Sequence, residues 1–394
     1  MNILFLSFYY QPDLSAGSFR NTALVKALLA QLPKGSRVDV ITTLPNRYST
    51  FSAAALEYEE ADGVSIHRIA LPSHQSGMLD QSKAFLSFAR QASMLASGKE
   101  YDLVYASSSR LMTAALGAWI AQRKKLPLYL DIRDIFVDTI KDVLPRKLAI
   151  VMKPVFSLVE RWTVRRATKI NVVSEGFVPY FRERYGELNL SSFTNGIDEE
   201  FLHVQPTDAD CSNPANKPPT ILYAGNMGEG QGLHSIIPGF AERLVGKANF
   251  KLVGAGGRLV QLKQAMDSKP SPNVSINAPV QRAELIAEYQ QADVLFLHLN
   301  DYDAFKKVLP SKLFEYAAMG KPILAGVSGY AAEFVERYID NAAVFPPCDV
   351  DGAVAALDKL SLETRPRTSF VNQFSRQNIM HKMATDVIST GAVG

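Results

Sequence analysis

The sequence has few cysteines, little net charge and no long apolar run, and each shortage excludes a class of protein. Its two cysteines, Cys211 and Cys348, are too few for a disulfide framework or a cysteine-based zinc site, and they suit a reducing compartment. Its net charge is only +3 over 394 residues, which argues against a nucleic-acid partner.

No uncharged apolar run approaches the roughly 18 residues that a transmembrane helix needs. The best candidate, 148–158, is interrupted by Lys153 and Pro154. The apolar segment 1–10 has neither a basic region nor a small-residue cleavage site, so it predicts a first β-strand and not a signal peptide. We therefore expect no membrane span and a cytoplasmic location.

Short β-rich runs alternate with runs of helical periodicity, which predicts βαβ units and mainly parallel sheets. Strands are expected at 3–8, 37–43, 64–69, 103–107, 128–132 and 169–173, and then at 220–223, 249–253, 274–277, 294–298, 323–325 and 342–344. Helices are expected at 19–32, 83–97, 112–123, 149–166, 233–244, 259–266, 282–291, 312–319, 330–338 and 368–388.

The segment 205–219 contains four prolines and no periodicity, so we expect a linker there. The expected domains are 1–204 and 220–367, followed by a C-terminal helix, 368–394, that packs back towards the first domain. Doubly wound sheets bind ligands beyond the carboxyl ends of their strands, and we expect a ligand there, in a cleft between the two halves.

A glycine-rich turn, 225–232, closes one expected strand and opens a helix. Its four glycines let the backbone approach a ligand closely, and a helix N-terminus favours an anion, which indicates a phosphate site. A glycine turn without a ligand explains this stretch equally well. A second, weaker turn of this kind follows the next strand at Gly254.

The most informative motif is 308–322, with the sequence VLPSKLFEYAAMGKP. Pro310 or Ser311 starts a helix, and Ser311 is a suitable N-cap. Lys312 adds a cation, and Glu315, one turn further on, can accept hydrogen bonds from the two hydroxyls of a ribose. This combination suits a nucleoside diphosphate, although a capped helix with a solvated Lys/Glu pair is the alternative.

These motifs resemble the donor domain of GT-B glycosyltransferases, specifically glycosyltransferase family 4. The resemblance rests on the glycine turn, on 278–293 and on 312–322, while 10–20 and 131–138 are similar to the acceptor half of the family. It implies an α/β fold of two Rossmann-like, doubly wound domains that face a cleft. It is strongest for the branch that builds bacterial surface polysaccharides.

The resemblance implies a retaining enzyme of hexosyltransferase type. The implied donor is a nucleotide sugar, a UDP-linked N-acetylated sugar, and the implied acceptor is a lipid-diphosphate-linked glycan of O-antigen or capsule synthesis. Such an enzyme is expected to be peripheral on the cytoplasmic face of the membrane. Two alternatives stay open: an epimerase of the same fold that acts on a nucleotide sugar, and a non-catalytic binding subunit.

The sequence departs from the family pattern at three positions. Lys307 stands where the family often has the first Glu of a Glu-x7-Glu pair, whose second Glu matches Glu315. Asn226 and Gln231 stand where the family has an Arg and a Lys. We expect Lys312 to supply the replacement cation, and an inactive homologue is the alternative that these departures leave open.

The first half contributes a glycine and an arginine after its first strand. Gly17 can bring backbone N–H groups near the donor phosphates, and Arg20 follows on the first helical turn, unless this is an ordinary βα loop. The resemblance adds backbone groups near Val280 and Arg282, which would hold the nucleobase. The expected donor-binding residues are Gly17, Arg20, Gly225, Asn226, Gly228, Gln231, Gly254, Val280, Arg282, Pro310, Ser311, Lys312, Leu313 and Glu315.

Three carboxylates and Arg133 lie at the end of another strand, in 131–138, where burial is costly unless the charges are paired. The resemblance places the acceptor hydroxyl nearby, with Asp134 as the residue that orients it. A purely structural Arg–Asp pair is the alternative. The expected catalytic residues are Asp134, Arg133, Lys312 and Glu315.

Asp-x-Asp pairs, which bind metal in some glycosyltransferases, occur at 208–210, 301–303 and 349–351. We expect no metal and no cofactor, because Lys312 and helix N-termini can neutralise the diphosphate. The segment 141–169 carries eight basic and two acidic residues among many apolar ones. It suits an anionic membrane surface, or else a core-facing helix with a solvated basic rim.

Overall fold

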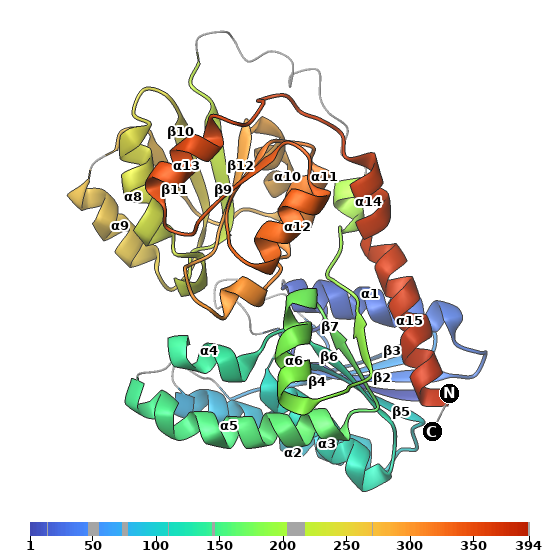
Figure 1. The fold of residues 1–394 in the computed structure, drawn as a ribbon. Helices are drawn as coiled ribbons and strands as arrows, with labels where there is room; N and C mark the ends of the chain where they lie inside the picture. The colour runs from blue at the N-terminus through green and yellow to red at the C-terminus, as the bar shows by residue number, and fades with distance from the viewer. Residues whose placement is uncertain are drawn as a thin grey trace. The chain divides into compact units, whose positions relative to one another are not determined.

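The computed structural model describes residues 1–13, 15–45, 55–72, 78–108, 110–143, 146–202, 217–269 and 271–392. They form two α/β units, Met1–Asn195 with Arg376–Gly394, and Gly196–Ser375 (Figure 1). The division after Asn195 comes earlier in the chain than the expected boundary at 204. Most of the expected linker, with Cys211 and the pair 208–210, lies outside the described residues.

The first unit contains an eight-stranded sheet in the order β3-β4-β2-β1-β5-β6-β7-β8. Every neighbouring pair is parallel except β3–β4. Chain order reverses between β1 and β5, so the switch point of this sheet lies at their carboxyl ends. The strands are β1 (Asn2–Leu6), β2 (Arg37–Thr43), β3 (Tyr58–Ala61), β4 (Val64–Ile69), β5 (Leu103–Ser108), β6 (Leu128–Ile132), β7 (Lys169–Val172) and β8 (Leu190–Ser192).

Helices cover both faces of this sheet, with α2, α3 and α5 on one face and α1 and α15 on the other (Figure 1). The helices of the unit are α1 (Ala16–Gln31), α2 (Met78–Ser97), α3 (Leu111–Lys124), α4 (Phe136–Val143), α5 (Arg146–Arg166), α6 (Val178–Tyr185) and α15 (Arg376–Ala392). The sheet is buried on both sides, which explains why β1, β5 and β6 consist of nearly continuous apolar residues.

The second unit contains a six-stranded, fully parallel sheet in the order β11-β10-β9-β12-β13-β14. Its strands are β9 (Thr220–Asn226), β10 (Asn249–Ala255), β11 (Val274–Asn277), β12 (Val294–His298), β13 (Ile323–Gly326) and β14 (Ala342–Phe345). Its helices are α7 (Glu199–Leu202), α8 (Leu233–Arg243), α9 (Leu259–Ser268), α10 (Arg282–Gln291), α11 (Lys312–Ala318), α12 (Tyr330–Tyr338), α13 (Val350–Leu357) and α14 (Thr368–Phe374). Each unit is an α/β unit with a parallel or mainly parallel sheet, which confirms the expected fold class.

The C-terminal segment differs from the expected single helix. Ser375 takes an extended ψ of 133° between α14 and α15, so the helix breaks there and α15 joins the first unit. Helix α15 packs along α1. Its Asp386 pairs with Lys169 and accepts a hydrogen bond of 2.9 Å from the Tyr129 hydroxyl, which ties α15 to the strands of the first sheet.

The sequence did not predict the short elements at the margins of the sheets. Strand β3 is an antiparallel edge strand with two glutamates and an exposed surface, so it lacks the apolar alternation that marks a half-buried strand. Among the described ranges, no helix is both long enough and apolar enough to cross a membrane.

Candidate functional site

Two glycine turns pack against each other at the carboxyl ends of β9 and β10. Gly225 and Gly254 are register partners with φ values of 153° and 149°, a region that side-chain-bearing residues rarely adopt. A Cβ at Gly254 would lie 1.9 Å from the Gly225 carbonyl oxygen. The second turn therefore has a packing reason for its glycine, and the structure brings both predicted turns together.

The first turn is closed by the neutral side chains of Asn226 and Gln231. The Asn226 Nδ2 atom donates to Gln231 Oε1 over 2.9 Å, and the Gly228 N–H donates to the same oxygen over 3.2 Å. The backbone then forms one 3-10 turn, Glu229–Gln231, before α8 begins. These two side chains shape the loop and bring no positive charge to it.

The side chain of Lys312 lies directly over this turn. A Cβ at Gly225 would lie 2.3 Å from Lys312 Cε, so a glycine is needed for the lysine to cross the end of β9. Lys312 Nζ is 3.9 Å from Glu315 Oε2 and 3.4 Å from the Tyr289 hydroxyl oxygen. The lysine and glutamate side chains remain 24% and 19% exposed, so both can reach a ligand.

Tyr289 connects these two charged groups and was not predicted from the sequence. It lies on α10, is fully buried, and donates a hydrogen bond of 3.0 Å to Glu315 Oε2. Burial raises the pKa of Tyr289 far above its usual value, and the Glu315 charge raises it further, so the hydroxyl stays protonated. In the sequence, Tyr289 looks like one more core position of an amphipathic helix.

Helix α11 begins without the expected serine cap. Ser311 occupies the N-cap position, but its φ and ψ of −61° and −28° are helical and its side chain makes no capping bond. The prediction of a Ser311 side-chain cap is therefore wrong. The Leu313 N–H donates a hydrogen bond of 3.2 Å to the Pro310 carbonyl oxygen and so closes the first turn. The Leu313 side chain is buried in the core.

Arg282 begins α10, and its side chain is committed to α7. Its Nη2 donates to Asp198 over 2.5 Å and to Glu200 over 3.4 Å, and its guanidinium lies 5.1 Å from the Phe201 ring centroid. Burial alone would lower the pKa of Arg282, but these carboxylates, with Glu315, raise it. Val280, in the preceding loop, is half-buried. Because the Arg282 side chain is engaged by these partners, only backbone groups are available here for a contact with a nucleobase.

His298 ties the glycine turn to the rest of the unit. Its Nδ1 is 2.7 Å from Gln231 O, and its Nε2 accepts a hydrogen bond of 2.9 Å from Cys348 N–H. Burial lowers the pKa of His298 to about 4, so the ring is neutral at pH 7. Nδ1 therefore carries the proton and donates it to the turn.

In the first unit, Arg20 of α1 and Asp131 of β6 form a fully buried ion pair. Arg20 Nε and Nη2 each donate to the carboxylate over 2.9 Å, and Asn171 Nδ2 adds a bond of 2.7 Å to Asp131. Burial alone would raise the pKa of Asp131, but Arg20 holds it below its ordinary value. The prediction that Arg20 reaches the donor is contradicted, because its side chain is 0% exposed and its donors are used internally.

Arg133 is the less satisfied arginine of this region. Its Nη1 atom is buried and has no hydrogen-bond partner in the part of the chain that the structure describes. A Cβ at Gly17, in the first turn of α1, would lie 3.3 Å from that atom. Burial lowers the pKa of Arg133, and the Arg20 charge acts in the same direction. The structure thus joins the predicted Gly17 and Arg133.

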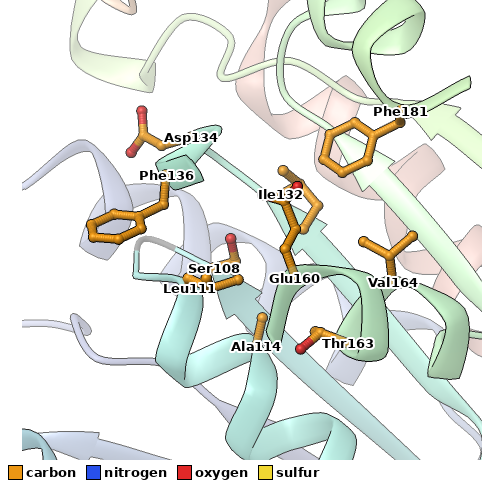
Figure 2. Close-up of a pocket in the computed structure, with 10 residues that line it drawn as sticks. All are labelled: Ser108, Leu111, Ala114, Ile132, Asp134, Phe136, Glu160, Thr163, Val164 and Phe181. Atoms are coloured by element: carbon orange, nitrogen blue, oxygen red, sulfur yellow. The ribbon is translucent and has the colours of Figure 1, made fainter. Parts of the chain in front are cut away.

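Asp134 lines a small pocket beyond the carboxyl ends of β5 and β6. Figure 2 shows the pocket, with Asp134 and Phe136 on one side and Val164 and Phe181 on the other. The pocket also contains Glu160, whose carboxylate accepts from the hydroxyl groups of Tyr180 and Tyr185. Burial raises the pKa of Glu160. The remaining lining residues are Ser108, Leu111, Ala114, Ile132 and Thr163.

The comparisons with known proteins match both units. Residues 21–189 match the family model for the glycosyl transferase 4-like domain, and residues 204–377 match that for glycosyl transferases group 1. The chain is a GT-B glycosyltransferase of family 4. The Escherichia coli K12 protein WcaI, assigned to colanic acid biosynthesis as a glycosyl transferase, is 27% identical over 199 residues. The match covers 48% of this chain and 48% of WcaI, so it spans about half the length of that relative.

Solved structures agree with this fold across the whole glycosyltransferase. Sucrose-phosphate synthase from Thermosynechococcus elongatus superposes with a TM-score of 0.75 at 13% identity, covering 100% of both chains. Anabaena Alr3699/HepE, solved in complex with UDP-glucose, gives a TM-score of 0.69 at 16% identity over 99% of this chain and 100% of that one.

Lys307 and the described Asp-x-Asp residues have separate structural settings in this glycosyltransferase. Lys307 ends a 3-10 turn, Phe305–Lys307, that precedes α11. Two of the described Asp-x-Asp residues serve local roles: Asp349 caps α13 by accepting from the Gly352 N–H, and Asp303 pairs with Lys306. Among the described residues, no group of three or more His, Cys, Asp or Glu side chains is suited to a metal ion.

Proposed function

We propose that the second unit binds a UDP-sugar, with Lys312 as the diphosphate cation and Glu315 as the acceptor for the ribose hydroxyls. The placement of the Lys312 side chain over Gly225, beside Glu315, carries this proposal. A lysine that crosses a glycine turn at the end of a central strand places its ammonium where a bound phosphate would lie. The Anabaena structure with UDP-glucose supports UDP as the nucleotide.

The proposed reaction is transfer of an N-acetylated sugar, with retention, to a lipid-diphosphate-linked glycan in O-antigen or capsule synthesis. The assignment of WcaI to colanic acid biosynthesis supports a polysaccharide product. The bond between the sugar and the diphosphate breaks, the acceptor oxygen joins the same face, and a phosphate oxygen takes the acceptor proton. Lys312 stabilises the departing charge, and no metal or cofactor takes part.

On the acceptor side, we propose that Asp134 orients the attacking hydroxyl and that Gly17 and Arg133 form a phosphate-binding group. Arg133 Nη1 has no partner among the described residues and lies beside Gly17, which supports the second assignment, because a buried guanidinium donor is costly unless a ligand completes it. The acceptor would be reached at the cytoplasmic face of the membrane, with 141–169 on the lipid surface.

A screen of nucleotides by thermal stabilisation tests the donor assignment, because a ligand that binds the native state raises its unfolding temperature. UDP and UDP-sugars should raise it, whereas GDP and ADP should not. Equal responses to all three diphosphates would contradict the assignment of UDP.

The neutral Asn226 and Gln231 are the observation that favours a non-catalytic protein. Incubation with a UDP-sugar and a lipid-linked acceptor separates the alternatives. A transferase forms product only with acceptor present, an epimerase converts the donor alone, and a binding subunit does neither.

A further inference from the structure

Helix α5 of the first unit is oriented with its apolar side outward. Ile150, Val151, Val155 and Leu158 are 72, 66, 50 and 66% exposed, and Trp162 is 39% exposed. With 3.6 residues per turn, these five positions fall on one face of the helix. We call them the outer face of α5.

The opposite side of α5 carries polar groups into the protein. Glu160 is 4% exposed and accepts hydrogen bonds of 2.7 Å from Tyr180 and 2.5 Å from Tyr185, while Thr163 is 1% exposed. A roll of the helix that buried the outer face would expose these bonds to water. The contacts of Glu160 therefore fix the apolar residues on the surface.

The exposed charged residues of α5 itself are all basic. Arg161, Arg165 and Arg166 are exposed on the last turns of α5, beside Trp162. Glu160 is the only acidic residue of the helix, and it is buried. An anionic lipid surface binds apolar side chains, an interfacial tryptophan and arginines that have no exposed acid on their own helix, whereas a protein partner of neutral composition leaves the arginines unmatched.

We infer that the outer face of α5 inserts into the interfacial layer of a membrane that contains anionic lipids, with the three arginines at the headgroups. This deepens the proposed function, since it says which side chains enter the lipid and places the first unit against the layer that carries the acceptor. It depends on no nucleotide binding, because Lys312 and Glu315, which carry the donor assignment, lie in the other unit.

Flotation with lipid vesicles tests the inference on the full chain. The wild-type protein should float with vesicles of about one third phosphatidylglycerol in phosphatidylcholine, less at high salt, and little with phosphatidylcholine alone. A V151S/V155S/L158S variant should bind the mixed vesicles at least about tenfold less. V260S is the matched control, because Val260 is 63% exposed on α9 of the other unit, and it should bind like wild type.

A second readout follows the outer face directly. The chain has two tryptophans, so a W119F variant leaves Trp162 as the only one. Its emission should shift to the blue with the mixed vesicles. Three results would each overturn the inference. The triple variant could float as well as V260S, the Trp162 emission could stay unshifted with vesicles, or the wild type could form a solution dimer that the triple variant dissociates.

The unfolding temperature and UDP affinity of the same variants should match wild type, which separates this result from the proposed function. A wild-type protein that floats but binds no UDP refutes the donor assignment only. One that binds UDP but does not float refutes the membrane face only.

Discussion

The Tyr289 hydroxyl donates a hydrogen bond of 3.0 Å to Glu315, and the same oxygen lies 3.4 Å from Lys312 Nζ. A fully buried tyrosine thus holds both of the partly exposed groups that we assign to the nucleotide. It fixes the rotamer of Glu315, so less ordering remains when a ribose binds.

Replacement of Tyr289 by Phe should weaken UDP binding by up to about tenfold, because a hydrogen bond to a charged group contributes about 1.5–3 kcal/mol and only part of this bears on the ligand. Calorimetric titration of Y289F, E315Q and the double variant measures the coupling. The two single effects should not add. Strict additivity would mean that Tyr289 does not act through Glu315.

The two glycine turns should respond differently to alanine. G225A places a Cβ against the flexible end of Lys312, so UDP affinity should fall while the fold survives. G254A places its Cβ against the Gly225 backbone, so the unfolding temperature should fall much further. G246A, at a glycine with positive φ and open surroundings, reports backbone strain alone. A G254A protein as stable as G246A would contradict the packing described here.

Arg133→Met should leave the unfolding temperature unchanged or raise it, because the buried Nη1 of Arg133 makes no hydrogen bond to any residue that the structure describes. Transfer should fall at least about tenfold if the group serves a phosphate. Thermal unfolding and initial rates are measured on the same preparation. A large loss of stability would assign Arg133 to the fold instead.

His298 makes the stability of the protein depend on pH. Its pKa is lowered from 6.5 to about 4 by burial, so the unfolded chain binds a proton first as the pH falls. The contribution of the neutral ring is fully present above pH 6.5 and is lost progressively between pH 6.5 and about 4, by at most about 3 kcal/mol. Urea unfolding across this range should show that slope, and H298Q should lack it. An equal slope in both proteins would place the titration elsewhere.

The α/β alternation could be predicted because buried parallel strands are nearly continuous apolar runs and the helices between them are periodic. Lys312 and Glu315 could be found because they are neighbours on one helix. The partner of Asp131 could not be predicted, because Arg20 and Arg133 both lie near strand ends. The pairing is decided by a contact between residues more than a hundred positions apart in the chain. Tyr289 has the same periodic position as a core residue, and only its hydroxyl distinguishes it.

The orientation of α5 could not be predicted either. Its sequence shows a basic and apolar helix, which fits a core helix or a surface helix. The buried hydrogen bonds of Glu160, made by two tyrosines of a later helix, decide which side faces outward.

The affinity of Lys312→Ala for UDP, measured by calorimetry, tests the central claim most directly. K359A, at an exposed lysine of the same unit, is the control for loss of one positive charge. We predict binding at least about tenfold weaker for K312A, with an unchanged unfolding temperature and wild-type affinity for K359A. Wild-type affinity in K312A, or an equal loss in K359A, would contradict the assignment of Lys312 as the diphosphate cation.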